Sequence, residues 1–164
     1  MTILSRPHFI RAWMHFSDIN ISVKDVGKKI GGHVQINIDS EIFQNACPIR
    51  MSYVLNKCGI LIPKGGKYAV VSGQDKKQYM YRVNDMIPYL EEIFGKPDIT
   101  VNHPKMSDFS GKKGIIVFSG NGWSNARGHV TLWNGMVCSD ACHFIGSDEN
   151  GTFIPQKAYL WLLT

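Results

Sequence analysis

A cysteine at the predicted start of a helix is the first candidate for chemistry. Cys47 follows Asn45, whose side chain is suited to cap a helix by accepting a hydrogen bond from a first-turn amide. Pro48 fits the first turn, where its missing amide donor is not needed. The unpaired amides of a helix start favour the thiolate, the attacking form of cysteine, and they can donate to a developing oxyanion. We therefore interpret Cys47 as a candidate nucleophile.

The same helix also allows a plainer interpretation of this cysteine. Buried cysteines are often small core residues without any reactivity. Cys58 lies at the other end of the predicted helix, where the helix field is reversed, and we expect it to be a core residue. The residues that recur at helical spacing on one predicted face are Cys47, Met51, Val54 and Cys58.

His129 and Asp140 are the predicted base and its orienting partner. Asn134-Gly135 lies between two β-prone runs, which is the strongest short-range signal for a hairpin with a two-residue turn. That register places His129 opposite Asp140 on one side of the sheet, with β-carbons about 5 Å apart. A carboxylate that accepts one imidazole N–H fixes the tautomer and leaves the other ring nitrogen free as a base. The alternative is a surface cross-strand pair that contributes less than about 1 kcal/mol.

A nucleophile, a base and an orienting group together supply what covalent cleavage of an amide or ester needs. This interpretation requires the face of the hairpin to meet the start of the helix. Arg50, in the first helical turns, is a candidate for supporting the site or for binding an anionic substrate group, and a plain helix surface is the alternative. Further substrate-binding candidates, chosen only because they directly precede the histidine strand, are Trp123, Ser124 and Asn125.

Two cysteines near the aspartate leave a conflict open. In an extended strand the α-carbons of Cys138 and Cys142 would lie about 13 Å apart, which is too far for a disulfide. A bend after Asp140 would let them bridge, but it would compete with regular strand pairing at that residue. A metal site built from these cysteines and His143 departs from the usual zinc spacing and has no evident fourth ligand. We expect neither a metal nor a cofactor.

The order of the predicted elements indicates the fold class. Helices in the first half and antiparallel strands in the second half are typical of an α+β domain, with helices packed on an antiparallel sheet. The length of 164 residues suits a single catalytic domain spanning residues 1–164. The predicted helices cover 7–16, 22–31, a segment starting near 47, and 84–95, and the predicted strands cover 114–119, 128–133, 136–141 and 158–163.

Charge and hydropathy restrict the possible partners. The formal net charge of +5 favours an acidic partner, such as nucleic acid, an anionic membrane surface or an anionic cell-wall polymer. The lysines are scattered, and none of their clusters reaches the length of a nucleic-acid-binding tail. No segment approaches 18 apolar residues, and the N-terminus has no secretory signal pattern. We expect a protein made in the cytoplasm that neither inserts into a membrane nor binds nucleic acid.

The order of a cysteine at a helix start, a histidine on a strand and a polar residue on the next strand resembles the NlpC-type papain-like peptidoglycan hydrolases. The segment 128–135 is similar to their histidine strand. The Cys47 segment, with Arg50, Ser52 and Leu55, and the segment 123–135 resemble the type VI secretion amidase effectors of the fourth family. The resemblance covers most of the chain and implies a papain-like NlpC-type fold.

That resemblance implies a toxin that type VI secretion machinery injects into the periplasm of a rival Gram-negative bacterium. There it would cut the bond between D-glutamate and meso-diaminopimelate in peptidoglycan stem peptides. A cognate immunity protein would block the cleft. By the same match, Cys47, His129 and Asp140 take the catalytic roles, and Cys138 and Cys142 form a disulfide.

Three other functions compete with this one. A papain-like cysteine protease or acyltransferase would use the same three residues and would differ in its products. A basic, non-enzymatic module that binds nucleic acid would show steep salt dependence and no loss of function when Cys47 is alkylated. A metal-dependent enzyme would lose activity in the presence of a chelator.

Overall fold

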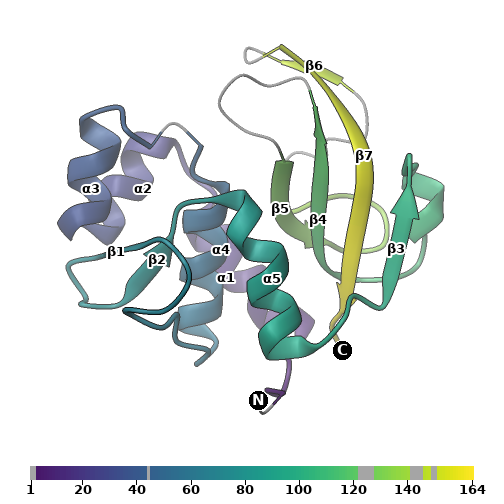
Figure 1. Ribbon diagram of the computed structural model, residues 1–164, viewed down its shortest axis with the longest axis horizontal. Helices are drawn as coiled ribbons and strands as arrows, with labels where there is room; N and C mark the ends of the chain where they lie inside the picture. Colours follow the sequence, from purple (N-terminus) through teal and green to yellow (C-terminus); the bar gives the residue numbers. More distant parts are fainter. Residues whose placement is uncertain (1–2, 44, 122–127, 141–145, 149–150) are drawn as a thin grey trace.

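The computed structural model describes residues 3–43, 45–121, 128–140, 146–148 and 151–164. The helices gather on one side and the main antiparallel sheet on the other, so the predicted α+β class is confirmed (Figure 1). The helices are α1 (Phe9–Ile19), α2 (Val23–Ile30), α3 (Gly32–Asp39), α4 (Cys47–Lys57) and α5 (Val83–Phe94), with a short 3-10 helix η1 (Met106–Phe109). The strands are β1 (Val70–Ser72), β2 (Gln78–Met80), β3 (Ile99–Asn102), β4 (Gly114–Asn121), β5 (Gly128–Trp133), β6 (Gly146–Asp148) and β7 (Gly151–Leu162).

The main sheet has the strand order β3-β7-β4-β5, and β6 pairs with β7. Each of these pairs is antiparallel. β5 is an edge strand, yet all six of its residues are buried. It lies on the side of the sheet nearest the helices and contacts α4 (Figure 1). This contact brings the two halves of the candidate site together.

The sheet is buried on both faces, as the alternation along β4 shows. Ile115 and Val117 belong to the larger core, which lies between the sheet and the helices. Ile116 and Phe118 point the other way, into a smaller core. Successive residues of a strand face opposite sides, so this period of two fixes which side chains meet the helices. The smaller core consists of Phe109, Ile116, Phe118, Trp133, Cys138, Ala158 and Leu160.

Helix α4 is the central helix, with nine of its eleven residues buried. Two buried polar side chains fix its orientation. The Ser52 hydroxyl donates to the Pro48 carbonyl at 2.8 Å and accepts from the Met80 amide of β2 at 2.9 Å. The Asn56 amide group donates to the Gln78 carbonyl, also of β2, at 2.9 Å. Because buried polar groups are costly when unpaired, these bonds favour a single rotation of α4.

The predicted helices are confirmed, with two corrections. In α1, the spacing of Phe9, Ile10, Trp13 and Phe16 predicts one apolar face, but the side chain of Ile10 is 70% exposed, while Phe9 and Phe16 are buried. Helix α3 was not predicted, because Gly31-Gly32 has the composition of an ordinary turn. Gly31 ends α2 with φ +70° and also precedes the first residue of α3. Such a positive φ suits glycine, which has no β-carbon to clash.

The predicted strands are confirmed in part. The strands at 114–119, 128–133 and 158–163 correspond to β4, β5 and β7. The strand predicted at 136–141 is wrong, because the described part of this segment contains only an isolated bridge at Cys138. The short strands β1, β2, β3 and β6 were not predicted. Among the described residues, no helix is both long and apolar enough to cross a membrane.

Candidate active site

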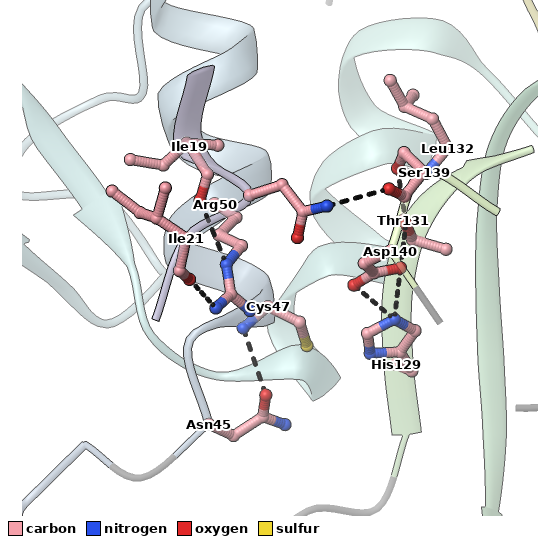
Figure 2. A network of polar contacts seen from close by, with 11 residues as sticks. Ile19, Ile21, Asn45, Cys47, Arg50, His129, Thr131, Leu132, Ser139 and Asp140 are labelled. Carbon is pink, nitrogen blue, oxygen red and sulfur yellow. Dashed lines mark hydrogen bonds and ion pairs between the residues drawn. The ribbon is translucent and has the colours of Figure 1, made fainter. Parts of the chain in front are cut away.

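Cys47 is the first residue of α4, as predicted, and its free thiol is fully buried. The residue that caps the helix is Ala46, not Asn45. Asn45 still makes the expected type of bond, because its side-chain oxygen accepts from the Cys47 amide at 3.1 Å (Figure 2). This bond engages the Cys47 amide and Pro48 has no amide hydrogen, so the first turn has fewer free donors for an oxyanion than the sequence analysis assumed.

His129 lies on β5 between the thiol and a carboxylate. Its ring is turned toward Cys47 on one side and Asp140 on the other (Figure 2). Nε2 lies 3.0 Å from Oδ2 and 3.2 Å from Oδ1 of Asp140. A hydrogen bond with the thiol of Cys47 is among the causes that raise the pKa of the ring. Because Nε2 is engaged by the carboxylate, Nδ1 is the nitrogen that remains to exchange a proton with sulfur.

The hairpin that carries Asp140 has a different register from the predicted one. Trp133 bridges Cys138, whereas a two-residue turn would place Trp133 opposite Met136. The Asn134 amide donates to the Val137 carbonyl at 3.0 Å, which makes the connection two residues longer. Because the shift is an even number of residues, it leaves each side chain on its predicted face. His129 and Asp140 therefore still meet, diagonally rather than directly opposite.

The charges of the site favour an ion pair. Burial alone would lower the pKa of His129, but the charge and hydrogen bond of Asp140, together with Cys47, outweigh it and raise the pKa to about 10. Burial would raise the pKa of Asp140, but the interactions with His129, Thr131 and Arg50 hold it below its ordinary value. The imidazole therefore carries a proton at neutral pH and the carboxylate is ionised.

We expect this ion pair to make stability depend on pH. The pKa of His129 rises from about 6.5 in the unfolded chain to about 10 in the folded one, so its contribution is complete below about pH 6.5. That contribution, on the order of a few kcal/mol, is lost as the pH rises through 10. The measurement is urea unfolding near pH 6, 8 and 10 for wild type and Asp140→Ala. Wild type should lose more stability across this range, and parallel curves would contradict the assignment.

Arg50 is turned toward the backbone between α1 and α2. Its Nη2 donates to the Ile21 carbonyl at 2.7 Å and its Nε to the Ile19 carbonyl at 3.3 Å (Figure 2). Burial lowers the pKa of Arg50, while the charges of Asp140 and Cys47 oppose that shift. These contacts favour the supporting role over the binding of an anionic substrate group, which stays a prediction.

Some of the remaining candidates lie among the described residues and the others lie outside them. Cys58 packs against the larger core, as predicted, and burial raises the pKa of its thiol. Cys138 is disulfide-bonded. Its predicted partner Cys142 lies outside the described residues, so the pairing stays a prediction. The other candidates outside the described residues are Trp123, Ser124, Asn125 and His143.

Thr131 was missed by the sequence reasoning although it contacts the site directly. Its hydroxyl donates to Asp140 Oδ1 at 2.6 Å. A signal for it existed, because Thr131 lies two residues after His129 on one strand and therefore shares its face. Within the described ranges, no group of three or more His, Cys, Asp or Glu side chains is placed to hold a metal ion.

A comparison with protein families identifies the family that has this arrangement. The family described as "Type VI secretion system (T6SS), amidase effector protein 4", or Tae4, has a sequence model that matches residues 43–161. The chain belongs to the Tae4 family. It is thus an amidase effector of type VI secretion, a class of protein that is delivered into target cells.

Solved Tae4 structures agree with this assignment over nearly the whole chain. Tae4 from Salmonella typhimurium, in complex with the immunity protein Tai4 from Enterobacter cloacae, is 60% identical, with a TM-score of 0.91 over 97% of this chain and 100% of that one. Tae4 from Enterobacter cloacae in its complex with Tai4 is 58% identical, with a TM-score of 0.92 over 98% and 100%. The same effector alone is 56% identical, with a TM-score of 0.91 over 99% and 100%. The fold is therefore the papain-like, NlpC-type fold. A search of curated proteins gave no match.

Proposed function

We propose that this Tae4 protein is a cysteine amidase that cuts the bond between D-glutamate and meso-diaminopimelate in peptidoglycan stem peptides. Residues 1–164 act as a single catalytic domain. The observation that carries the proposal is the buried imidazole of His129, placed between the thiol of Cys47 and the carboxylate of Asp140, in a chain of an amidase family.

The reaction proceeds through a thioester. Cys47 and His129 form a thiolate–imidazolium pair, in which His129 holds the proton released by the sulfur, and the sulfur attacks the carbonyl carbon of the amide. When the carbon–nitrogen bond breaks, His129 gives its proton to the leaving amine. A water molecule, deprotonated by His129, then attacks the thioester, and the sulfur leaves as a thiolate. This step releases the carboxylic acid and restores the thiolate–imidazolium pair. Asp140 stays ionised throughout and stabilises the imidazolium.

The position of Cys47 at the start of α4 supports the attack step. The positive end of the helix favours the thiolate, and the Arg50 guanidinium adds a positive charge near both Cys47 and Asp140. Water is largely excluded, because Cys47 is fully buried and the His129 side chain nearly so. Charges in such a site are less screened than in water, so each interaction has a larger effect.

Family membership supports the partners and the location that we propose. Two of the three similar structures described above are complexes of Tae4 with the immunity protein Tai4. We infer that a cognate immunity protein binds this chain and blocks its active site. The substrate lies in the periplasm of the target bacterium, where type VI secretion delivers the effector. The net charge of +5 suits an anionic wall polymer.

Mass spectrometry of digested peptidoglycan tests this function against the rival cysteine chemistries. We expect each cleavage to add one water and to leave D-glutamate with a free side-chain carboxyl and diaminopimelate with a new amino group. The same enzyme, incubated with denatured protein substrates, should release no peptides. Cleavage at another bond of the stem, or of the proteins instead, would contradict the proposed substrate while leaving the cysteine chemistry possible.

A further inference from the structure

Asp140 lies outside the strands, so backbone pairing does not fix the position of its carboxylate. The backbone pairing along β5 reaches Trp133 and Cys138, and the Ser139 amide then donates to the Leu132 carbonyl at 2.8 Å. Among the described contacts of Asp140, no backbone ladder bond continues this pairing. Its side chain is placed instead by side-chain hydrogen bonds from His129 and Thr131.

The hydrogen bonds around Thr131 have a fixed direction. An ionised carboxylate only accepts, so the Thr131 hydroxyl must donate its proton to Asp140 Oδ1, at 2.6 Å. Thr131 Oγ1 is then an acceptor for the Ser139 hydroxyl, 2.8 Å away. The Ser139 oxygen accepts in turn from the Leu132 amide at 3.2 Å. These bonds form one directed chain from a backbone amide to the carboxylate.

These hydrogen bonds are buried, so water cannot take the place of a lost donor. Thr131 is fully buried, and the Asp140 side chain is only 12% exposed. Thr131 engages Oδ1, while Oδ2 lies at the shorter distance, 3.0 Å, from Nε2 of His129. The hydrogen bond to Oδ1 restricts rotation of the carboxylate about its Cβ–Cγ bond. The second oxygen, Oδ2, therefore stays in line with the ring N–H. Hydrogen-bond chains of this kind also strengthen each member by polarisation.

A contact from outside the hairpin holds Ser139, the serine in this series of hydrogen bonds. The side-chain amide of Asn20 donates to the Ser139 carbonyl at 3.1 Å. Asn20 lies between Ile19 and Ile21, whose carbonyls bind Arg50 of the cysteine helix. The same turn therefore contacts both the Cys47 helix and the Asp140 segment. Ser139 is held in place from outside the hairpin, which lets it orient the Thr131 hydroxyl.

We propose that Thr131 is a positioning residue for the amidase reaction, its hydroxyl oriented by Ser139 so that the Asp140 carboxylate stays aligned with the N–H of His129. This inference rests on the proposed function. It assigns to Thr131 a role in the reaction beyond that of a core residue of β5. The chemistry depends on the hydroxyl alone, so serine should replace threonine and valine, which has the same shape without the hydroxyl, should not.

The test compares Thr131→Val with Thr131→Ser. We expect Thr131→Val to lower kcat by about tenfold or more and to change KM less than about twofold, because a buried hydrogen bond to a charged group typically contributes about 10- to 100-fold. The acidic limb of the pH profile should move to higher pH, since the Thr131 hydrogen bond helps to keep the pKa of Asp140 low. Thr131→Ser should stay within about threefold of wild type. The matched control is Thr100→Val on the exposed side of β3.

A proton NMR spectrum gives a second readout that does not need activity. Wild type and Thr131→Ser should show a slowly exchanging, downfield imidazole N–H signal from His129, and Thr131→Val should lose it. An unchanged signal together with unchanged kcat in a folded Thr131→Val would overturn the inference. If that variant fails to unfold cooperatively, Ser139→Ala replaces it, with an expected loss of about threefold or more in kcat. A wild-type enzyme without amidase activity would refute the proposed function, while the NMR comparison would still decide the role of Thr131.

Discussion

Replacing Cys47 with alanine is expected to abolish amidase activity and leave the protein folded. Loss of the nucleophile in a catalytic triad lowers kcat on the order of 10⁵-fold or more, because the covalent intermediate cannot form. The cost to folding should be small, about 1 kcal/mol, since alanine removes a single sulfur atom from a fully buried site. The measurements are kcat on purified stem peptides and the thermal unfolding midpoint.

Cys58 provides the matched control for this experiment. It is the other free cysteine among the described residues, and it lies just beyond the opposite end of α4. Cys58→Ala makes the same chemical change without touching the site, so it should retain activity within about twofold. Normal release of fragments by folded Cys47→Ala would show that sulfur is not the nucleophile.

Asp140→Ala should have the second largest effect, a loss of kcat of about 10²- to 10⁴-fold. Without the carboxylate, Nε2 of His129 loses its acceptor, so neither the tautomer nor the ring orientation is fixed. The loss should be smaller than for Cys47→Ala, because a thiol and an imidazole remain in contact. Steady-state kinetics of both variants, at equal folded fractions, measure the difference.

The control for Asp140 is the same substitution at Asp25, an exposed residue in the first turn of α2. Asp25→Ala should leave turnover unchanged. If folded Asp140→Ala turned over like wild type, the aspartate would be a structural partner of His129 and not a participant in the reaction. An effect confined to KM would likewise assign Asp140 to substrate binding.

The hairpin shows how much of the site the sequence could predict. Asn134-Gly135 correctly indicated a reversal of the chain between His129 and Asp140. The predicted two-residue length of the turn was wrong. The Asn134 side chain accepts from the amides of Met136 and Val137 and stabilises a longer connection. Asn-Gly is compatible with both connections, so composition alone cannot separate them. The pairing of His129 with Asp140 survived because the period of a strand is two and the error was even.

The contacts of Arg50 could not be predicted for a different reason. Helical periodicity identifies an exposed face only when a helix has one, and α4 is buried on nearly all sides. The two carbonyls that accept from Arg50 belong to Ile19 and Ile21, about thirty residues earlier in the chain. Only the tertiary packing of the α1–α2 turn on α4 brings them together. Nothing in the local sequence distinguishes such a buried guanidinium from a surface one.

The proton exchange between Cys47 and His129 is the central claim, and the alkylation rate of Cys47 tests it most directly. Iodoacetamide reacts with the thiolate, so its rate near pH 6 reports how readily the imidazole removes the thiol proton. Mass spectrometry of the peptides that contain Cys47 and Cys58 would measure alkylation of Cys47, with Cys58 as an internal reference. We predict that His129→Gln slows alkylation of Cys47 by at least about tenfold and leaves Cys58 unchanged. Equal rates at Cys47 in wild type and a folded His129→Gln would contradict the account.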